Sequence, residues 1–288
     1  MAKAVSNLPA SIREKLLNLA RAENQVFDVI LVRYGLERFL SRLAQSEHRD
    51  SYVLKGGMLV TAWIDDGNRV TRDADFLGFG EAGEQDLLHR FRTIMSKEDN
   101  DGLRFDTEAL RATTIREQGE YGGIRLMTTA FLGNTRIPIT LDIGFGDALA
   151  DPTQFIDYPT LLGSAPPRVR AYPPATVVAE KFQAMVSLGV VNTRMKDYYD
   201  LWTIPKVMPI AADDLDAAIQ ATFNRRQTAI PTTRPPGLSD EFYNDAGKQQ
   251  QWAAYARSIN LDDIALGEVV EVIWDYIGRS CGRLSHPI

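Results

Sequence analysis

The chain has little of what disulfide-bonded and zinc-binding proteins depend on. Its 288 residues include one cysteine, Cys281, and three histidines. A single cysteine excludes an intramolecular disulfide and is typical of a protein kept in a reducing cytoplasm. One thiol and three histidines also offer no convincing ligand set for zinc.

Long apolar runs are missing too. No stretch of about 18 apolar residues occurs, so we expect no transmembrane helix. The first residues, Met1 to Ser6, are not followed by an apolar segment, so we expect no signal peptide. The composition, 44% apolar and 24% charged, is that of an ordinary globular chain. These features predict a cytoplasmic protein.

An excess of positive charge is also lacking. The chain has 38 acidic and 32 basic residues, a formal net charge of −6. Proteins that bind nucleic acid over a whole surface are usually basic, so an RNA or DNA substrate would have to meet a local patch. The candidate patches are Arg168 with Arg170, Arg194 with Lys196, and Arg225 with Arg226. Basic pairs of this kind also occur on ordinary solvated surfaces.

Apolar periodicity predicts helices at both ends of the chain and strands between them. Helices are expected over 9–46, with Gly35 as a candidate break, and then over 58–64, 81–96, 175–188, 195–203, 212–225, 246–258 and 262–278. Strands are expected over 51–54, 72–76, 103–105, 109–115, 124–132 and 136–143, with glycine-rich turns typical of antiparallel hairpins. This order predicts an α+β fold, with N-terminal helices and a core sheet in 1–165 and a helical domain in 166–288.

The most informative feature is the pair Asp73 and Asp75. On an extended segment, a period of two puts both carboxylates on one face, with Ala74 and Phe76 on the other. Two adjacent anions repel each other, so the arrangement needs a cation. Mg²⁺ takes oxygen ligands and keeps positions open for substrate phosphates. The pair therefore predicts chemistry on a nucleotide.

Two further features add to this pair. Gly56-Gly57 lies between a strand and a helix, where glycine lets the backbone approach a phosphate and a helix N-terminus attracts anions. A tight strand-to-helix turn explains the two glycines equally well. Asp142 alternates with the apolar residues of 137–143, so it lies opposite the core side of its strand. It is either a solvent-facing residue, or a third carboxylate that completes a metal site or acts as a base.

The helical half contributes a lysine. On the helix 175–188, Lys181 lies within a stripe of apolar residues, where an ammonium group must reach solvent or meet anions. Its partners would be triphosphate oxygens or the metal-binding carboxylates. On the following helix, Asp197 faces inward and Asp200 lies one turn further on. A partly buried carboxylate needs a partner, and Lys181 and Arg194 are the predicted ones.

Taken together, these residues resemble the nucleotidyltransferase superfamily, and more narrowly the AbiEii/MenT toxin family of type IV toxin–antitoxin systems. The resemblance extends over roughly 50–230. It is carried by Leu54-Lys55-Gly56-Gly57, Arg69-x-Thr71-Arg72-Asp73-Ala74-Asp75, Leu141-Asp142-Ile143-Gly144-Phe145-Gly146-Asp147, Glu180-Lys181, Arg194-x-Lys196-Asp197-x-Tyr199-Asp200-Leu201 and Phe223-Asn224-Arg225-Arg226-Gln227-Thr228.

The resemblance implies a mixed sheet flanked by helices, with a helical region that completes the active site. It implies transfer of NMP from an NTP, with Mg²⁺ or Mn²⁺ as cofactor, to an acceptor such as the 3′ end of tRNA, which would block translation. By position, Asp73 and Asp75 would bind metal, Lys181 would contact phosphates and Asp197 would complete the site. Asp142 is the expected third carboxylate and Asp147 the alternative.

The same resemblance assigns the nucleotide to Gly56, Gly57, Thr71, Lys181 and Arg194. Thr71 stands where the family often has serine and keeps the hydroxyl. A cognate antitoxin is an expected partner, and no membrane is. Two other functions stay open: transfer to a hydroxyl of a small molecule or protein, and a catalytically silent module that binds a nucleotide or a partner.

Overall fold

The structure, a computed structural model, describes residues 7–64, 69–80, 83–115, 122–147, 154–261 and 264–285. The chain divides into two compact units. The first comprises Met1–Ala62, Val70–Gly146 and Thr153–Ala171, and the second comprises Trp63–Arg69, Asp147–Pro152 and Tyr172–Ile288. The division into 1–165 and 166–288 stays a prediction.

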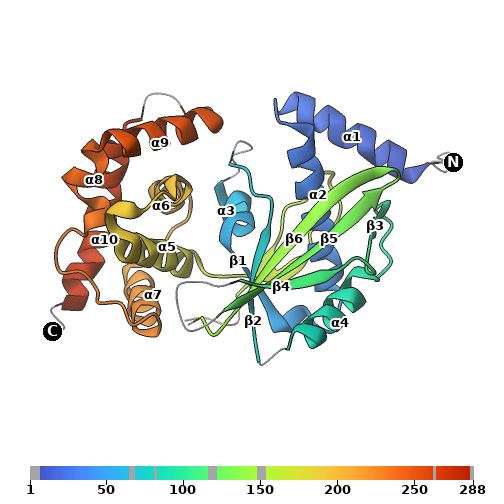
Figure 1. Ribbon diagram of the computed structural model, residues 1–288, viewed down its shortest axis with the longest axis horizontal. Helices are drawn as coiled ribbons and strands as arrows, with labels where there is room; N and C mark the ends of the chain where they lie inside the picture. Colours follow the sequence, from blue (N-terminus) through green and yellow to red (C-terminus); the bar gives the residue numbers. More distant parts are fainter. Residues whose placement is uncertain are drawn as a thin grey trace. The chain divides into compact units, whose positions relative to one another are not determined.

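The first unit combines helices with a mixed sheet, as the sequence predicts (Figure 1). Its helices are α1 (Leu8–Ala22), α2 (Phe27–Ala44), α3 (Gly56–Ile64), whose last residues belong to the second unit, and α4 (Glu84–Met95). Its strands are β1 (Tyr52–Lys55), β2 (Ala74–Gly78), β3 (Leu103–Phe105), β4 (Arg111–Ile115), β5 (Gly123–Leu132), β6 (Thr135–Phe145), β7 (Phe155–Asp157) and β8 (Arg168–Arg170).

The main sheet has the order β1-β2-β6-β5-β3, with β4 also paired to β5. Strand β2 runs parallel to β6, and the other pairs in this sheet are antiparallel. Strands β5 and β6 form a long hairpin around Gly133, whose φ of 60° suits glycine. The parallel pairing places residues of β2 directly beside residues of β6 that follow them by 67 positions, such as Asp75 and Asp142.

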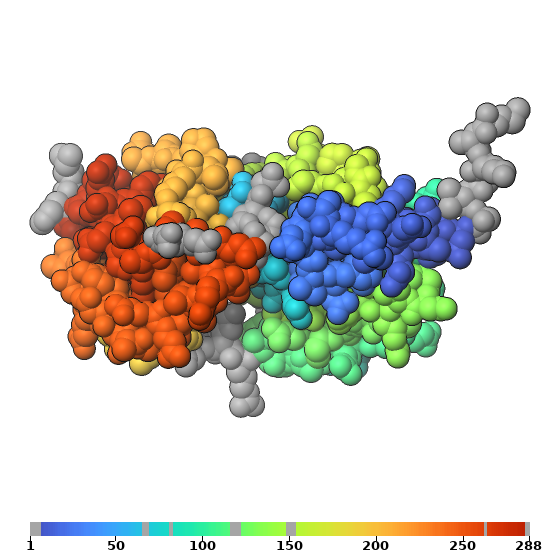
Figure 2. Space-filling model, turned by 90° about the horizontal axis from the view of Figure 1, so that it is seen from above, coloured from blue at the N-terminus to red at the C-terminus, as the bar shows by residue number. Residues whose placement is uncertain are grey.

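One face of this sheet forms the core. Residues Ile137, Ile139, Leu141 and Ile143 of β6 alternate with polar ones and are buried on the side of α2. Phe39 of α2 contacts the rings of Phe76 and Phe91 at centroid distances of 5.9 and 5.7 Å. In Figure 2, the blue N-terminal helices lie between the green strands and the yellow-green chain near 155–171. The helices therefore cover one face of the strands.

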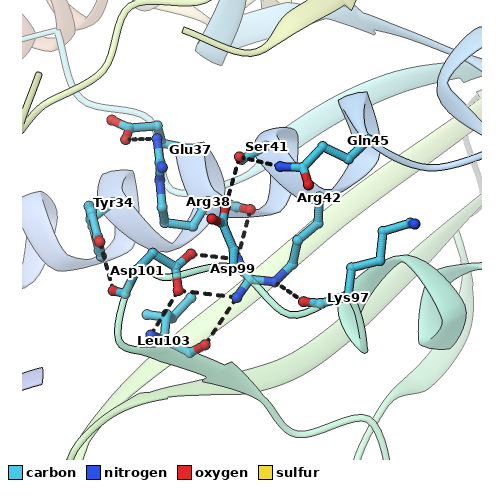
Figure 3. Close-up of polar contacts among 10 residues, drawn as sticks. All are labelled: Tyr34, Glu37, Arg38, Ser41, Arg42, Gln45, Lys97, Asp99, Asp101 and Leu103. Carbon is cyan, nitrogen blue, oxygen red and sulfur yellow. Dashed lines mark hydrogen bonds and ion pairs between the residues drawn. The ribbon is translucent and has the colours of Figure 1, made fainter. Parts of the chain in front are cut away.

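A buried arginine fastens α2 to the chain that follows α4 (Figure 3). Arg42 donates to both carboxylate oxygens of Asp101, at 2.6 and 3.1 Å, and to the carbonyl oxygens of Arg38, Lys97 and Leu103. These contacts satisfy all five N–H donors of the guanidinium. We interpret this cluster as structural, because every polar group that Arg42 presents already has a partner within the fold.

The second unit is helical. It contains α5 (Pro174–Leu188), α6 (Met195–Val207), α7 (Ala212–Arg225), α8 (Asp240–Asn244), α9 (Ala246–Ser258) and α10 (Leu266–Ser285). Helix α5 packs on α6 and α7, and Phe182 contacts Phe223 at a ring distance of 5.4 Å. Helix α10 buries its apolar stripe, which includes Val270, Ile273 and Ile277. The predicted helical C-terminal region is confirmed.

Several sequence-based boundaries were wrong. The predicted helix 9–46 breaks between Ala22 and Phe27, not at Gly35. Gly35 lies inside α2, where a Cβ atom would be 2.7 Å from Ile139 Cδ1, so glycine there allows close packing on β6. Helix α3 begins at Gly56, two residues earlier than expected. Strands β7 and β8 were not predicted, because three-residue strands carry too little periodicity.

Some predictions concern residues outside the described ranges. These are the predicted helix starts at 81–82 and 262–263 and the turn at 65–68. Residues 1–6 also lie outside, and with them the expectation about a signal peptide. Among the helices that the structure describes, none combines the length and the apolar character that a bilayer span needs.

Candidate active site

A row of charged residues crosses four neighbouring strands of the first unit. Lys55 of β1 is paired in register with Asp75 of β2, Asp75 with Asp142 of β6, and Asp142 with Arg125 of β5. Residues paired directly across strands point to the same face of a sheet. Two acidic side chains thus stand side by side, with a basic side chain on either flank.

Asp75 lies in β2 and Asp73 directly precedes this strand, which begins at Ala74, two residues later than expected. Both are partly buried, and Ala74 between them is fully buried. Burial, together with the negative charges of Asp73 and Asp142, raises the pKa of Asp75 to about 6, against an opposing effect of Lys55. The two carboxylates are therefore close enough to repel each other, as expected of ligands that share a cation.

Thr71 holds the carboxylate of Asp73. Its hydroxyl donates to Asp73 Oδ1 at 2.9 Å, and the Thr71 side chain is buried. The sequence assigned Thr71 to nucleotide binding, and that role stays a prediction. In the structure, this hydroxyl positions Asp73 by limiting the rotamers of its side chain.

The Gly56-Gly57 turn closes against Asp75. The backbone N–H of Gly57, at the start of α3, donates to Asp75 Oδ2 at 3.4 Å. Gly56 has φ of 65°, and a Cβ atom there would lie 2.0 Å from the same oxygen. Glycine at position 56 is thus needed for the backbone to approach this carboxylate. The contact of the two glycines with phosphate stays a prediction.

Asp142 forms an ion pair with Arg125. Arg125 Nε and a terminal nitrogen donate to its two oxygens at 2.8 and 2.7 Å, a bidentate ion pair. The alternative third carboxylate, Asp147, lies in the second unit, where it accepts from Tyr172 Oη at 3.3 Å and lies 3.6 Å from Arg226. Within the described ranges, no three His, Cys, Asp or Glu residues are arranged to hold a metal ion.

Two carboxylates nevertheless suit a hard divalent ion. Asp73 and Asp75 supply carboxylate oxygens, the ligand type that Mg²⁺ prefers. Mg²⁺ is commonly held by one or two carboxylates, with waters and substrate phosphates at the remaining positions, so a third protein ligand is not required. Burial, and then the neighbouring anions Asp73 and Asp142, raise the pKa of Asp75, and a cation bound to these carboxylates would offset both effects.

The second unit contains a buried ionic cluster around Lys181. Lys181 Nζ lies 2.5 Å from Asp197 Oδ1 and 2.8 Å from Asp200 Oδ2. Arg194 Nε lies 2.6 Å from Asp197 Oδ2, an ion pair without hydrogen-bond geometry, since this oxygen has no hydrogen-bond partner among the described residues. The predicted pairing of Lys181 and Arg194 with these aspartates is confirmed.

Arg69 completes the cluster and was missed by the sequence analysis as a partner. Its guanidinium donates to both oxygens of Asp200, at 2.7 and 2.5 Å, and its side chain is 1% exposed. Lys181 and Arg69 lower the pKa of Asp200 to about 2, against the opposing effect of burial. Three cations thus surround two carboxylates, and the cluster has one positive charge in excess.

The electrostatics of this cluster keep Lys181 charged. Burial disfavours an ammonium group, but the charges of Asp197 and Asp200 outweigh it, so the pKa of Lys181 is raised. Arg194 is the most accessible member, with a side chain 55% exposed. An anionic ligand would therefore meet a cluster that already carries net positive charge and is fixed by ion pairs.

The roles of Arg125 and Arg69 could not be predicted from the sequence. Arg125 gives no sign of its role until the β5–β6 register places it beside Asp142. Arg69 precedes the Asp-x-Asp segment by a few residues, but its pairing with Asp200 spans 131 positions. Glu180, Tyr172 and Arg226 form another polar group, in which Arg226 lies 3.8 Å from Glu180.

Comparisons with known proteins show the family and the fold of the chain. The family described as "Nucleotidyl transferase AbiEii toxin, Type IV TA system" matches residues 38–275 of the chain. No curated protein matches the chain. The solved structure of MenT4, a nucleotidyltransferase toxin from Mycobacterium tuberculosis H37Rv, is similar, with 16% identity and a TM-score of 0.53, and the alignment covers 96% of this chain and 98% of that one.

Weaker similarities involve proteins of Helicobacter pylori. A putative nucleotidyltransferase has 14% identity and a TM-score of 0.44, covering 88% of this chain and 92% of that one. The protein JHP933 has 13% identity and a TM-score of 0.42, covering 87% of this chain and 94% of that one. The likeness to MenT4 shows that this chain has the fold of a nucleotidyltransferase toxin.

Proposed function

Because this chain belongs to the AbiEii nucleotidyl transferase toxin family of type IV toxin–antitoxin systems, we propose that it transfers NMP from an NTP to the 3′ end of tRNA. The observation that supports this most directly is the coupled pair Asp73 and Asp75 at the start of β2, with the Gly56-Gly57 turn against it. Such a modification of the acceptor end would block translation. The toxin would act in the cytoplasm and have a cognate antitoxin.

In this proposal Asp73 and Asp75 hold a divalent ion, Mg²⁺ or Mn²⁺. When bound, that ion would neutralise charge on the triphosphate and polarise the phosphorus that is attacked. Thr71 and the Gly57 N–H keep the two carboxylates oriented. Asp142 is assigned as the third carboxylate; its bidentate contact with Arg125 supports a positioning role toward the neighbouring Asp75.

The reaction is a displacement at the α-phosphorus. An acceptor hydroxyl attacks, the bond to the bridging oxygen breaks, and pyrophosphate leaves with the negative charge that develops. Lys181 is assigned to the phosphates, with Arg194 beside it, because the cluster that holds them carries excess positive charge. Asp197 fixes the Lys181 ammonium group. Either Asp142 or Asp197 takes the proton of the acceptor hydroxyl; both carboxylates are held by ion pairs, and catalysis rests mainly on positioning and charge.

A labelled-NTP assay tests the proposal. The purified chain is incubated with each of the four NTPs, labelled at the α-phosphate, together with Mg²⁺ and total tRNA. We expect label on the 3′ end of tRNA and release of unlabelled pyrophosphate, both abolished by EDTA. Absence of label from RNA with every NTP, in the presence of Mg²⁺ or Mn²⁺, contradicts the assignment.

The formal net charge of −6 keeps one other acceptor class open. An acidic protein suits a small-molecule or protein hydroxyl better than a polyanionic RNA. Adding cell protein and a small-molecule extract to parallel reactions distinguishes these acceptors, because the label then appears in protein or in the small-molecule fraction. Binding of NTP without release of pyrophosphate in any reaction would instead identify a silent module.

A further inference from the structure

The sheet of the first unit has a second face that its N-terminal helices do not cover. In Figure 1, β4, β5 and β6 pass in front of α2. Along β5 and β6, buried residues on the α2 side alternate with partly or fully exposed residues on this other face. We call this face, over β3 to β6, the open face. It is the same face on which Asp75 and Asp142 lie.

The open face carries arginines of four strands. Strand alternation and register place Arg104 of β3, Arg111 of β4, Arg125 of β5 and Arg136 of β6 on it. Within these strands, its acidic residues are Asp75 of β2 and Asp142, the candidate site itself. On a chain with a formal net charge of −6, this is a local concentration of positive charge.

Three of these arginines have no carboxylate partner among the described residues. Arg104, Arg111 and Arg136 are exposed, and their side chains form no ion pair or hydrogen bond within the described part of the chain. By contrast, many other arginines of the described chain, such as Arg42, Arg69 and Arg125, are paired with acids. Unpaired guanidinium groups on one face are available for an anionic ligand.

Two of these three arginines stack on an aromatic ring. Phe131 of β5 lies between Arg104 and Arg136 in the register, and their guanidinium carbons lie 4.7 and 5.7 Å from its ring centroid. Stacking on an aromatic face restricts a long side chain that would otherwise be mobile. The Arg104–Phe131–Arg136 group is therefore a partly preorganised pair of cations.

The distance along the strand matches an extended ligand. Arg136 precedes Asp142 by six residues of β6, which at about 3.3 Å each is roughly 20 Å. Arg111, paired with Met127, lies between these two ends of the face. A row of cations that leads to Asp142 and Asp75 is complementary to a chain of phosphates whose end reaches Asp75, one of the two proposed metal ligands.

From this arrangement, we propose that the open face binds the phosphate backbone of a single-stranded RNA acceptor, with Arg104, Phe131 and Arg136 as its outer contact and Arg111 between. This inference rests on the proposed function, since it supplies the binding surface for the RNA that would receive the nucleotide. Groups of cations with interleaved aromatic rings are a common way to bind single strands.

Binding of labelled RNA without NTP tests this inference. The wild-type chain, the Arg104→Ala/Arg136→Ala double variant and an Arg21→Ala/Arg257→Ala control are titrated with a single-stranded RNA oligonucleotide and with tRNA at several salt concentrations. The control removes the same charge from exposed positions on helices α1 and α9. Thermal melting confirms that each variant is folded.

We expect the open-face variant to bind RNA on the order of tenfold more weakly, with the slope of log K against log salt reduced by about 1.4 for two lost contacts on a single strand. The control should match the wild type. Equal binding and equal slopes in the open-face variant overturn the inference, as does a wild-type chain that binds no RNA. RNA binding through this face without nucleotide transfer would contradict the proposed function alone.

Discussion

The carboxylate of Asp75 lies where the side chain of any residue other than glycine at position 56 would begin. A Cβ atom on Gly56 would be 2.0 Å from Asp75 Oδ2 and 2.8 Å from Asp75 Cβ, so even rotation of the carboxylate would leave a clash. Gly56 also has φ of 65°, which is unfavourable for other residues. The turn that precedes α3 and the paired aspartates therefore form one local structure.

The first prediction concerns this turn. Gly56→Ala should lower the free energy of unfolding by at least about 1–2 kcal/mol from backbone strain and displace Asp75, abolishing nucleotide transfer. Gly163→Ala is the matched control, because Gly163 has φ of 71° and a Cβ atom added there would meet no atom within 4 Å. Urea unfolding and label incorporation per folded molecule measure the two effects. Equal activity in the two variants would show that the Gly56–Asp75 contact is unimportant.

The second prediction concerns the metal-binding pair. Asp73→Ala and Asp75→Ala should each reduce nucleotide transfer by several orders of magnitude, since the charge of the triphosphate would no longer be held. Each variant should also lose binding of Mn²⁺ measured directly, by calorimetry or by electron paramagnetic resonance. Near-normal turnover by Asp73→Ala refutes the assignment of the pair.

The third prediction separates Asp142 from that pair. Because Asp142 forms a bidentate pair with Arg125, Asp142→Asn and Arg125→Gln should reduce transfer by similar, smaller factors. The double variant should be little worse than either single one, which is the signature of two residues acting as a unit. Independent, multiplying losses would instead indicate that Asp142 acts on metal or acceptor without Arg125.

The fourth prediction concerns the lysine. Lys181→Met should greatly weaken binding of an NTP, yet leave the weak binding of the corresponding nucleoside unchanged, because only the phosphates would meet the ammonium group. Lys206→Met, which removes an exposed lysine from beside Trp202 on α6, is the control. Unfolding is monitored in parallel, because Lys181 is ion-paired to two aspartates. Unchanged NTP affinity in folded Lys181→Met would remove Lys181 from the nucleotide site.

The fifth prediction uses the acidity of Asp200. Asp200→Asn should cost about 3–5 kcal/mol at neutral pH, because Arg69 and Lys181 lose their buried partner. Its pKa is about 2 in the folded chain against 3.8 for an unperturbed group, so the carboxylate stabilises the fold at pH above 3.8. That contribution, about 2 kcal/mol, is lost as the pH falls through 2.

The difference in unfolding free energy between wild type and Asp200→Asn should therefore shrink between pH 4 and pH 2. Asp50→Asn serves as the control, since Asp50 belongs to an exposed ion pair with Arg49 and should change stability by less than about 1 kcal/mol. A difference that stays constant over this range would show that Asp200 is not held ionised by its partners.

The sequence alone identified the residues on which the proposed chemistry depends. Local patterns suffice for this, because a period of two places Asp73 and Asp75 together and an apolar helix stripe isolates Lys181. The same patterns predicted the long hairpin of β5 and β6 and most helices. They failed for the break at residues 23–26, where Asn24 has φ of 51°, and for the strands β7 and β8, whose three residues each carry too little periodicity.

What only the tertiary structure decided is which charges meet. The register of β1, β2, β6 and β5 sets Lys55, Asp75, Asp142 and Arg125 in one row. Arg69, which lies between α3 and β2, meets Asp200 of α6, 131 positions further along the chain. These partners are far apart in the chain, and strand register is fixed by burial of whole faces and not by any single residue. For that reason the sequence determined the candidate groups of this protein and the partners of Lys181, while the fold alone determined that Arg125 meets Asp142 and Arg69 meets Asp200.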